Sequence, residues 1–129
     1  MSARARVVDA SVVAALAFGE PRRDEAVALL DGAEVLGPTL LAYELTDVAC
    51  KKCRARPDEA ARVASQLSDA LILTDRWLEV DADEVLVLAL VWGLSAYDAS
   101  YLWLAGELGM PLVTFDRRLA AAATEMGLS

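Results

Sequence analysis

Short apolar runs alternate along the chain with longer stretches in which apolar residues recur at helical spacing. The short runs predict strands at residues 6–9, 34–36 and 111–115. Residues 71–74 and 77–80 also have strand character, and they could form one strand or two around a turn. The chain therefore offers several short strands, each followed by a much longer polar and apolar mixture.

The stretches between the strands have helical periodicity. Ser11 is placed to cap the first helix and Gly19 to end it, while Pro38 fits the first turn of the third helix. The segment 81–92 is apolar on most sides, so we expect it to pack against neighbours on several faces. The predicted helices cover residues 12–18, 21–31, 38–54, 57–70, 81–92, 95 to 106 or 109, and 117–126.

This alternation of strands and helices predicts an α/β fold. Strands that alternate with helices favour a three-layer α/β/α sandwich with a central, mainly parallel sheet. A length of 129 residues, without repeats or a linker, fits a single domain over residues 1–129. In such sheets ligands bind beyond the carboxyl ends of the strands, so those ends are where we look for chemistry.

Four carboxylates stand at the ends of predicted elements. They occur in the phrases VVDAS, AYELT, AYDAS and VTFDR, as Asp9, Glu44, Asp98 and Asp116. An isolated carboxylate among apolar residues is costly to desolvate, so four of them suggest a shared role. The chain has no histidine, and clustered carboxylates suit a hard divalent cation such as Mg²⁺ or Mn²⁺. We therefore predict these four as metal ligands, with Asp47 as a possible auxiliary acid.

Each of these acids also has a simpler interpretation. Asp9 and Asp116 could each cap the helix that follows, and Ser95 to Asp98 has the spacing of a capping box. Glu44 could be a surface residue, although its neighbours are mostly apolar. These interpretations are plausible one at a time, and all four together would be a coincidence.

A carboxylate cluster of this kind predicts phosphodiester hydrolysis. Two dications held about 3.5–4 Å apart can activate a water and stabilise a leaving oxygen. Without histidine, the proton acceptor is a carboxylate or bulk water, and the nucleophile is a metal-bound water. The acids repel one another, so metal binding should stabilise the fold.

Charge and composition limit the kind of partner. The net charge of −8 argues against a plain nucleic-acid binder, but it permits an enzyme that meets phosphates through metal. The basic residues are clumped, as at Arg22–Arg23 and Arg117–Arg118. The chain is 57% apolar with a mean hydropathy of +0.38, which favours a subunit contact or a protein partner. No targeting segment is evident, and the longest apolar run, Val85–Leu94, is too short to cross a bilayer.

Cys50 and Cys53 form a CxxC pattern late in a predicted helix. Such a pattern can be a redox site or half of a zinc site, but no second Cys or His pair completes a zinc site here. We interpret them as free thiols that are helical neighbours, which fits a reducing cytosol.

At these motifs the chain resembles the PIN-domain ribonucleases and, among them, the VapC-type toxins of toxin–antitoxin pairs. VVDASVVAAL resembles the first strand of that family with its aspartate and the small polar residue two places on, here Asp9 and Ser11. The phrases PTLLAYELTDVA and GLSAYDASYLWLA resemble the segments that carry Glu44 and Asp98. PLVTFDRRLAAAA resembles the closing strand and helix, with Thr114 and Asp116 at the polar positions.

The resemblance implies a Mg²⁺- or Mn²⁺-dependent endoribonuclease that acts in the cytoplasm on RNA. It implies catalytic and metal-binding roles for Asp9, Glu44, Asp98 and Asp116, with Ser11 and Thr114 in support. It also implies a homodimer that is held inactive by a cognate antitoxin protein. Asp116 is the least secure of the acids, because the fourth acid varies in that family.

Two other classes remain open from the sequence. A receiver-type signalling domain shares the size, the sheet and an acidic pocket, but it usually needs paired acids after the first strand and a lysine after the last. Here Asp9 stands alone, and Lys51 and Lys52 are the only lysines. A non-catalytic interaction domain, with the acids serving only as helix caps, is the other alternative.

Overall fold

The fold is built around a parallel sheet. The computed structural model describes residues 4–129. Within them, four strands run in the order β3–β2–β1–β4, and every pairing is parallel. The strands are β1 (Ala5–Val8), β2 (Glu34–Pro38), β3 (Arg76–Leu78) and β4 (Leu112–Val113). The central position of β1 aligns Val7 with Leu36 on one side and with Leu112 on the other.

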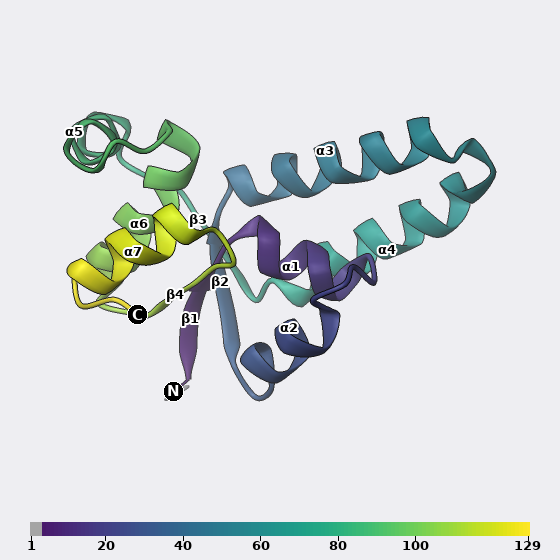
Figure 1. The fold of residues 1–129 in the computed structure, drawn as a ribbon, viewed down its shortest axis with the longest axis horizontal. Coiled ribbons are helices and arrows are strands. Elements are labelled where there is room, and N and C mark those ends of the chain that lie inside the picture. The colour runs from purple at the N-terminus through teal and green to yellow at the C-terminus, as the bar shows by residue number, and fades with distance from the viewer. Residues whose placement is uncertain (1–3) are drawn as a thin grey trace.

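Helices cover both faces of this sheet. Figure 1 shows α6 and α7 on one side and α1, α2 and α4 on the other, so the predicted three-layer α/β/α architecture is confirmed. A one-turn 3-10 segment, Pro57–Glu59, joins α3 to α4. The helices are α1 (Ala10–Ala17), α2 (Arg23–Leu30), α3 (Leu40–Ala55), α4 (Ala60–Leu73), α5 (Ala82–Trp92), α6 (Ala96–Leu108) and α7 (Arg117–Glu125).

The core forms where β1 is covered from both sides. Val7 and Val8 of β1 are fully buried, as are Val12 and Val13 of α1 and Leu102 of α6. A strand that is buried on both faces carries no polar alternation, which explains the continuous apolar run before Asp9.

Two predictions about helix starts were wrong. Asp9, not Ser11, is the N-cap of α1: its backbone is extended and its side chain accepts the N–H of Ser11. Pro38 ends β2 opposite Leu78 instead of entering the first turn of α3. Proline is tolerated there because it lies beyond Leu36, the last residue of β2 that pairs with β1, so the ladder to β1 loses no donor. On the other side, the N–H of Thr39 donates to the carbonyl of Leu78.

The segment before β3 also differs from the prediction. Residues 71–73 complete α4, so only Arg76–Leu78 forms a strand. Leu71 and Leu73 are half-buried against the core from a helix, and short apolar runs do not distinguish that case from a strand. The turn at Asp75 ties the segment to β2, because its carboxylate accepts the N–H of Val35 and its own N–H donates to the Val35 carbonyl.

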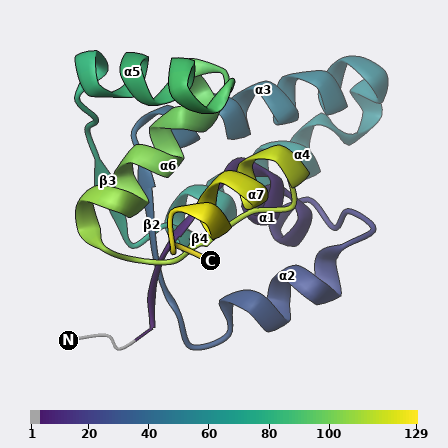
Figure 2. The ribbon, with the colours of Figure 1, turned by 60° about the vertical axis from the view of Figure 1, so that its left-hand side comes forward.

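Helix α5 is not packed on several faces, contrary to the sequence-based prediction. Figure 2 shows it on the outer side of α6, away from the sheet. Only Val85 and Ala89 are buried. Its outward face carries four apolar side chains, which we call the α5 stripe: Leu86, Val87, Leu90 and Val91, between 58% and 76% exposed.

Two smaller expectations can be compared with the described residues. Cys50 and Cys53 are free thiols in α3, as predicted. Within residues 4–129 no single helix is both long enough and apolar enough to cross a bilayer, although α5 and α6 meet that test jointly across a bend of 107°.

Candidate active site

Asp9 stands at the carboxyl end of the central strand and is only 5% exposed. One carboxylate oxygen accepts two bonds from Ser11, from the N–H at 3.1 Å and from Oγ at 2.6 Å. The other oxygen accepts a bond from Thr114 Oγ1 at 2.5 Å. Both oxygens are therefore held, and the carboxylate has one orientation.

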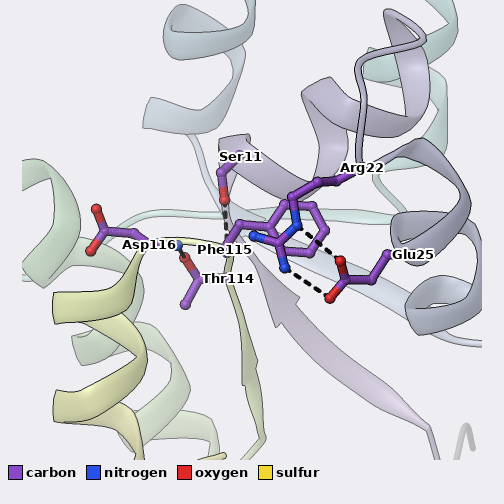
Figure 3. A network of polar contacts seen from close by, with 6 residues as sticks. All are labelled: Ser11, Arg22, Glu25, Thr114, Phe115 and Asp116. Carbon is purple, nitrogen blue, oxygen red and sulfur yellow. Dashed lines mark hydrogen bonds and ion pairs between the residues drawn. The ribbon is translucent and has the colours of Figure 1, made fainter.

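Ser11 and Thr114 also join the two segments that carry the acids. Ser11 Oγ accepts the N–H of Phe115 at 3.0 Å, and Thr114 Oγ1 accepts the N–H of Asp116 at 3.0 Å (Figure 3). Each hydroxyl thus donates to Asp9 and accepts from the backbone after β4. The link between these two strand ends, which the parallel sheet predicted, is a direct hydrogen-bond network.

Glu44 approaches the site from α3 and is held by a tyrosine that the sequence analysis missed. Tyr101 of α6 is 1% exposed, and its hydroxyl donates to Glu44 Oε1 at 2.5 Å. Burial and the charge of Glu44 raise the pKa of Tyr101, so the phenol stays protonated and can donate. Tyr101 lies three residues after Asp98 on the same helix, and that spacing was the available signal.

Asp98 lies in the first turn of α6 and Asp116 directly precedes α7, and for both a capping role was the alternative. The N-cap of α6 is Ser95, whose Oγ accepts the backbone N–H of Asp98 at 3.1 Å. The cap therefore uses the backbone of Asp98 and not its carboxylate. Asp116 does cap α7, because its Oδ1 accepts the N–H of Leu119 at 2.9 Å. Capping alone does not account for the acids, since their charges also act on one another.

Burial is the main cause of the raised pKa values of three of these acids, and repulsion between the acids adds to it. Burial raises the pKa of Asp9, and the charge of Asp98 adds to the rise, while the bonds from Ser11 and Thr114 oppose it. Burial also raises the pKa of Glu44, with Asp9 and Asp98 adding to it and the Tyr101 bond opposing it. For Asp98, burial and then the charge of Asp116 raise the pKa, and Arg118 lowers it.

The structure thus brings Asp9, Glu44 and Asp98 within electrostatic reach of each other, with Asp116 next to Asp98. No three acidic or cysteine side chains of residues 4–129 are arranged to hold a metal by themselves. The donor set nevertheless fits a hard dication, because Mg²⁺ retains several waters and needs only one or two carboxylates. A dication would also relieve the repulsion between these acids, which adds to the rise in pKa that burial causes.

A cavity of about 490 Å³ opens beside Glu44, between α3 and the start of α6. Asp47 lines it, but this acid pairs with Lys51 at 3.0 Å on the exposed side of α3. Tyr97 lines the same cavity and is 62% exposed. Asp47 therefore stands at the rim of the site, away from the group around Asp9.

Two arginines near the acids were also missed as individuals. Arg118 donates to the carbonyl of Gly93, and its positive charge lowers the pKa of Asp98. Arg22 lies over the ring of Phe115, 3.7 Å from its centroid. The sequence showed each only as half of a basic pair, because neither contact is local.

Comparison with known proteins agrees with this arrangement. The family model for the PIN domain matches residues 6–125. Ribonuclease VapC3 of Pyrobaculum aerophilum is 37% identical over 120 residues, which cover 88% of this chain and 91% of that protein. Exonuclease VapC9 of the same organism is 41% identical over 86 residues, or 64% of this chain and 62% of that protein.

A solved structure extends the likeness to the fold. The crystal structure of PAE2754 from Pyrobaculum aerophilum superimposes with a TM-score of 0.75 at 32% identity, over 92% of this chain and 86% of that chain. The match to the PIN family model includes the motifs that carry Asp9, Glu44 and Asp98. This chain therefore belongs to the PIN-domain family and, within it, to the VapC-type proteins.

Proposed function

We propose that this protein is a metal-dependent endoribonuclease, the toxin of a toxin–antitoxin pair, and that it acts in the cytoplasm on RNA. One observation carries the proposal: a buried Asp9, fixed by Ser11 and Thr114, lies within electrostatic reach of Glu44 and Asp98. The names of the similar proteins, a ribonuclease and an exonuclease, support nuclease chemistry at this cluster.

Asp9, Glu44 and Asp98 would hold Mg²⁺ or Mn²⁺, with Asp116 at the edge of the site. A bound dication supplies an activated water and neutralises charge that develops on the phosphate. Ser11 and Thr114 hold both oxygens of Asp9 in place, and Tyr101 does the same for Oε1 of Glu44. Because their pKa values are raised, mainly by burial, Glu44 and Asp98 would accept a proton from water more readily than ordinary carboxylates do.

RNA cleavage by purified protein with Mn²⁺ or Mg²⁺ tests the proposal. We expect EDTA to abolish cleavage. We expect Asp98→Asn to lower kcat/KM by more than the roughly 10–100-fold that loss of a residue orienting a metal ligand typically costs, because it removes a charged ligand itself. Asp69→Asn is the matched control, since Asp69 is an exposed acid on α4. Equal cleavage by both variants would contradict the proposed site.

The mode of cleavage needs a separate test, because one similar protein is named an exonuclease. A circular single-stranded RNA has no end from which an exonuclease could start. We expect the wild-type protein to linearise it and Asp98→Asn to leave it intact. If only linear RNA were shortened, one nucleotide at a time from an end, the endonuclease assignment would be wrong.

We also propose that a second copy of this chain covers the α5 stripe. Hollows of about 310 and 430 Å³ flank the ridge of the stripe, so a ridge from another molecule has a place to pack. Antiparallel pairing about a two-fold axis would set Leu86 and Val87 against Leu90 and Val91 of the other copy. It would also bring the acidic first turn of α5 towards Arg118, which contacts the far end of the helix.

Light scattering after size-exclusion chromatography tests this interface. We expect the wild-type protein to be a dimer and Leu90→Lys to be a monomer. Ile72→Lys is the control, because Ile72 is an 80% exposed apolar residue on α4, outside the stripe. A monomeric wild type, or a dimeric Leu90→Lys, would overturn the assignment.

The proposed antitoxin is a protein that inhibits cleavage by binding this chain. We expect co-expression with the product of an adjacent gene to yield a stable complex and to suppress RNA cleavage. Growth arrest on expression of the wild-type chain alone, absent for Asp98→Asn, is the cellular readout. A wild-type chain that cleaves RNA yet leaves growth unaffected would contradict the toxin role.

A further inference from the structure

A second hollow lies beside the acid cluster and is not used by it. This pocket, of about 480 Å³, runs between α2, the start of β1 and the β4–α7 segment. Its lining combines arginines with apolar residues, among them Leu112, Val113 and Phe115. We call it the Arg22 pocket. The arginines that line it are Arg4, Arg6 and Arg22.

The guanidinium of Arg22 is fixed as a flat platform. It lies 3.7 Å from the centroid of the Phe115 ring. Its Nε and Nη2 donate to the two oxygens of Glu25 at 2.9 and 2.8 Å, a bidentate pair that sets the plane. One face of the plane rests on the ring, and half of the side chain remains exposed, which leaves the opposite face accessible.

The platform connects directly to the acid cluster. Phe115 donates its backbone N–H to Ser11, which in turn donates to Asp9. Figure 3 shows Arg22 on one side of the Ser11–Phe115 contact and Asp116 on the other. A linear polymeric ligand bound across the acid cluster could therefore place its neighbouring residue in the Arg22 pocket.

Resting on the proposed nuclease function, we propose that the Arg22 pocket binds the nucleotide next to the scissile phosphate, with its base stacked on the exposed face of Arg22. Proteins recognise single-stranded RNA by stacking bases on aromatic rings and on guanidinium planes. Arg6 lines the same pocket and makes no ion pair or side-chain hydrogen bond within residues 4–129, so its charge is available for a phosphate.

An RNA base fits this platform better than an acidic peptide does. The charge of Arg22 is already matched by Glu25, so a carboxylate from a partner protein would gain little there. The flat exposed face is unaffected by that ion pair and still offers a stacking surface. The pocket therefore contributes affinity and base preference next to the cut, and Arg22 is a positioning residue for the RNA.

Steady-state cleavage of a short single-stranded RNA tests the proposal with three variants. Arg22→Ala removes the platform, and Arg22→Lys keeps the charge but removes the plane. Arg54→Ala is the control, because it removes the same charge from an exposed position near the end of α3. We expect both Arg22 variants to raise KM by about 5- to 150-fold, the range for loss of one stacked base, with a smaller change in kcat.

A binding measurement that needs no cleavage separates this inference from the proposed function. In an Asp98→Asn background, oligoribonucleotides that carry 2-aminopurine at successive positions report stacking by fluorescence quenching. We expect strong quenching at one position and its loss in both Arg22 variants but not in Arg54→Ala. Thermal unfolding of each variant confirms that it is folded.

Two results would overturn the inference. In the first, both Arg22 variants match Arg54→Ala in KM and in quenching, so Arg22 does not contact RNA. In the second, RNA binding is unchanged while inhibition by the antitoxin is lost, so the pocket belongs to a protein partner. If the wild type cuts no RNA but quenching still depends on Arg22, the nuclease proposal fails and the nucleotide pocket stands.

Discussion

At the scale of single residues, the site depends on hydroxyl groups that orient carboxylates. Ser11 and Thr114 hold Asp9, and Tyr101 holds Glu44. Each of these bonds opposes the burial that raises the pKa of the acid concerned. The hydroxyl groups thereby limit the rise in pKa that burial causes and favour the charged carboxylates that a cation site requires.

Tyr101→Phe tests the orienting role of a hydroxyl. The ring that fills the core is kept, while Glu44 loses its donor. We expect the Mn²⁺ concentration for half-maximal cleavage to rise about 10-fold, since groups that orient metal ligands typically contribute 10–100-fold. Tyr43→Phe, which removes an exposed hydroxyl, is the control. An unchanged Mn²⁺ dependence in Tyr101→Phe would show that Glu44 is oriented by other means.

At the scale of elements, the acids are placed by the junctions between strands and helices. At the β2–α3 junction the strand and the helix approach each other closely. A Cβ at Gly37 would lie 2.7 Å from Cδ2 of Leu41, a fully buried residue one turn before Glu44. The close approach of β2 to α3 therefore sets where the Glu44 helix begins.

Substitution of two glycines should have opposite effects on stability. Gly37→Ala should lower the free energy of unfolding by about 1–3 kcal/mol, because Leu41 must move within a packed core. Gly106→Ala should raise it by about 0.5–1 kcal/mol, since Gly106 lies inside α6 and its Cβ would meet only ordinary contacts. Urea denaturation of the two variants measures both changes. A stabilised Gly37→Ala would mean that this junction has slack.

At the scale of the whole molecule, a chain of net charge −8 concentrates several acids near the carboxyl end of its central strand. Asp9, Glu44 and Asp98 all have pKa values raised above their ordinary 3.8 and 4.5. The folded state therefore binds their protons more tightly than the unfolded state does. Their stabilising contribution is complete below the ordinary values and is lost as the pH rises through the raised ones.

Thermal unfolding between pH 4 and pH 8 measures this dependence. Without metal, we expect the wild type to lose stability relative to Asp98→Asn as the pH rises, because the variant carries one charge fewer in the cluster. Mn²⁺ should raise the Tm of the wild type more at pH 8 than at pH 5, since the cation binds the ionised acids. Parallel pH profiles for the two proteins would show that the acids do not destabilise the metal-free fold.

The sequence was most informative where local pattern and tertiary environment agree. The run before Asp9 predicted a buried strand and its acidic end, because β1 is covered on both faces. The hydrophobic pattern gave wrong predictions at residues 71–73, where an apolar run belongs to a helix, and in α5, where an apolar surface faces outward.

The contacts that complete the site could not be predicted from local pattern. Tyr101 reaches Glu44 from 57 positions away, and Thr114 reaches Asp9 from 105 positions away. Such contacts depend on the order of strands in the sheet, which hydrophobic periodicity leaves open. The assignment of catalytic and metal-binding roles to the four acids stays a prediction.

Because Asp9 is both a helix cap and a member of the acid cluster, a mutation there can remove the proposed activity without removing the cap. Asparagine caps helices as well as aspartate does, and it carries no charge to repel its neighbours. A single change at this codon would therefore remove a charged ligand from the proposed site while keeping a residue that can cap α1. A population exposed to the unrestrained protein could escape through such an exchange without accumulating misfolded chains, and inactive copies would persist in genomes with an intact architecture.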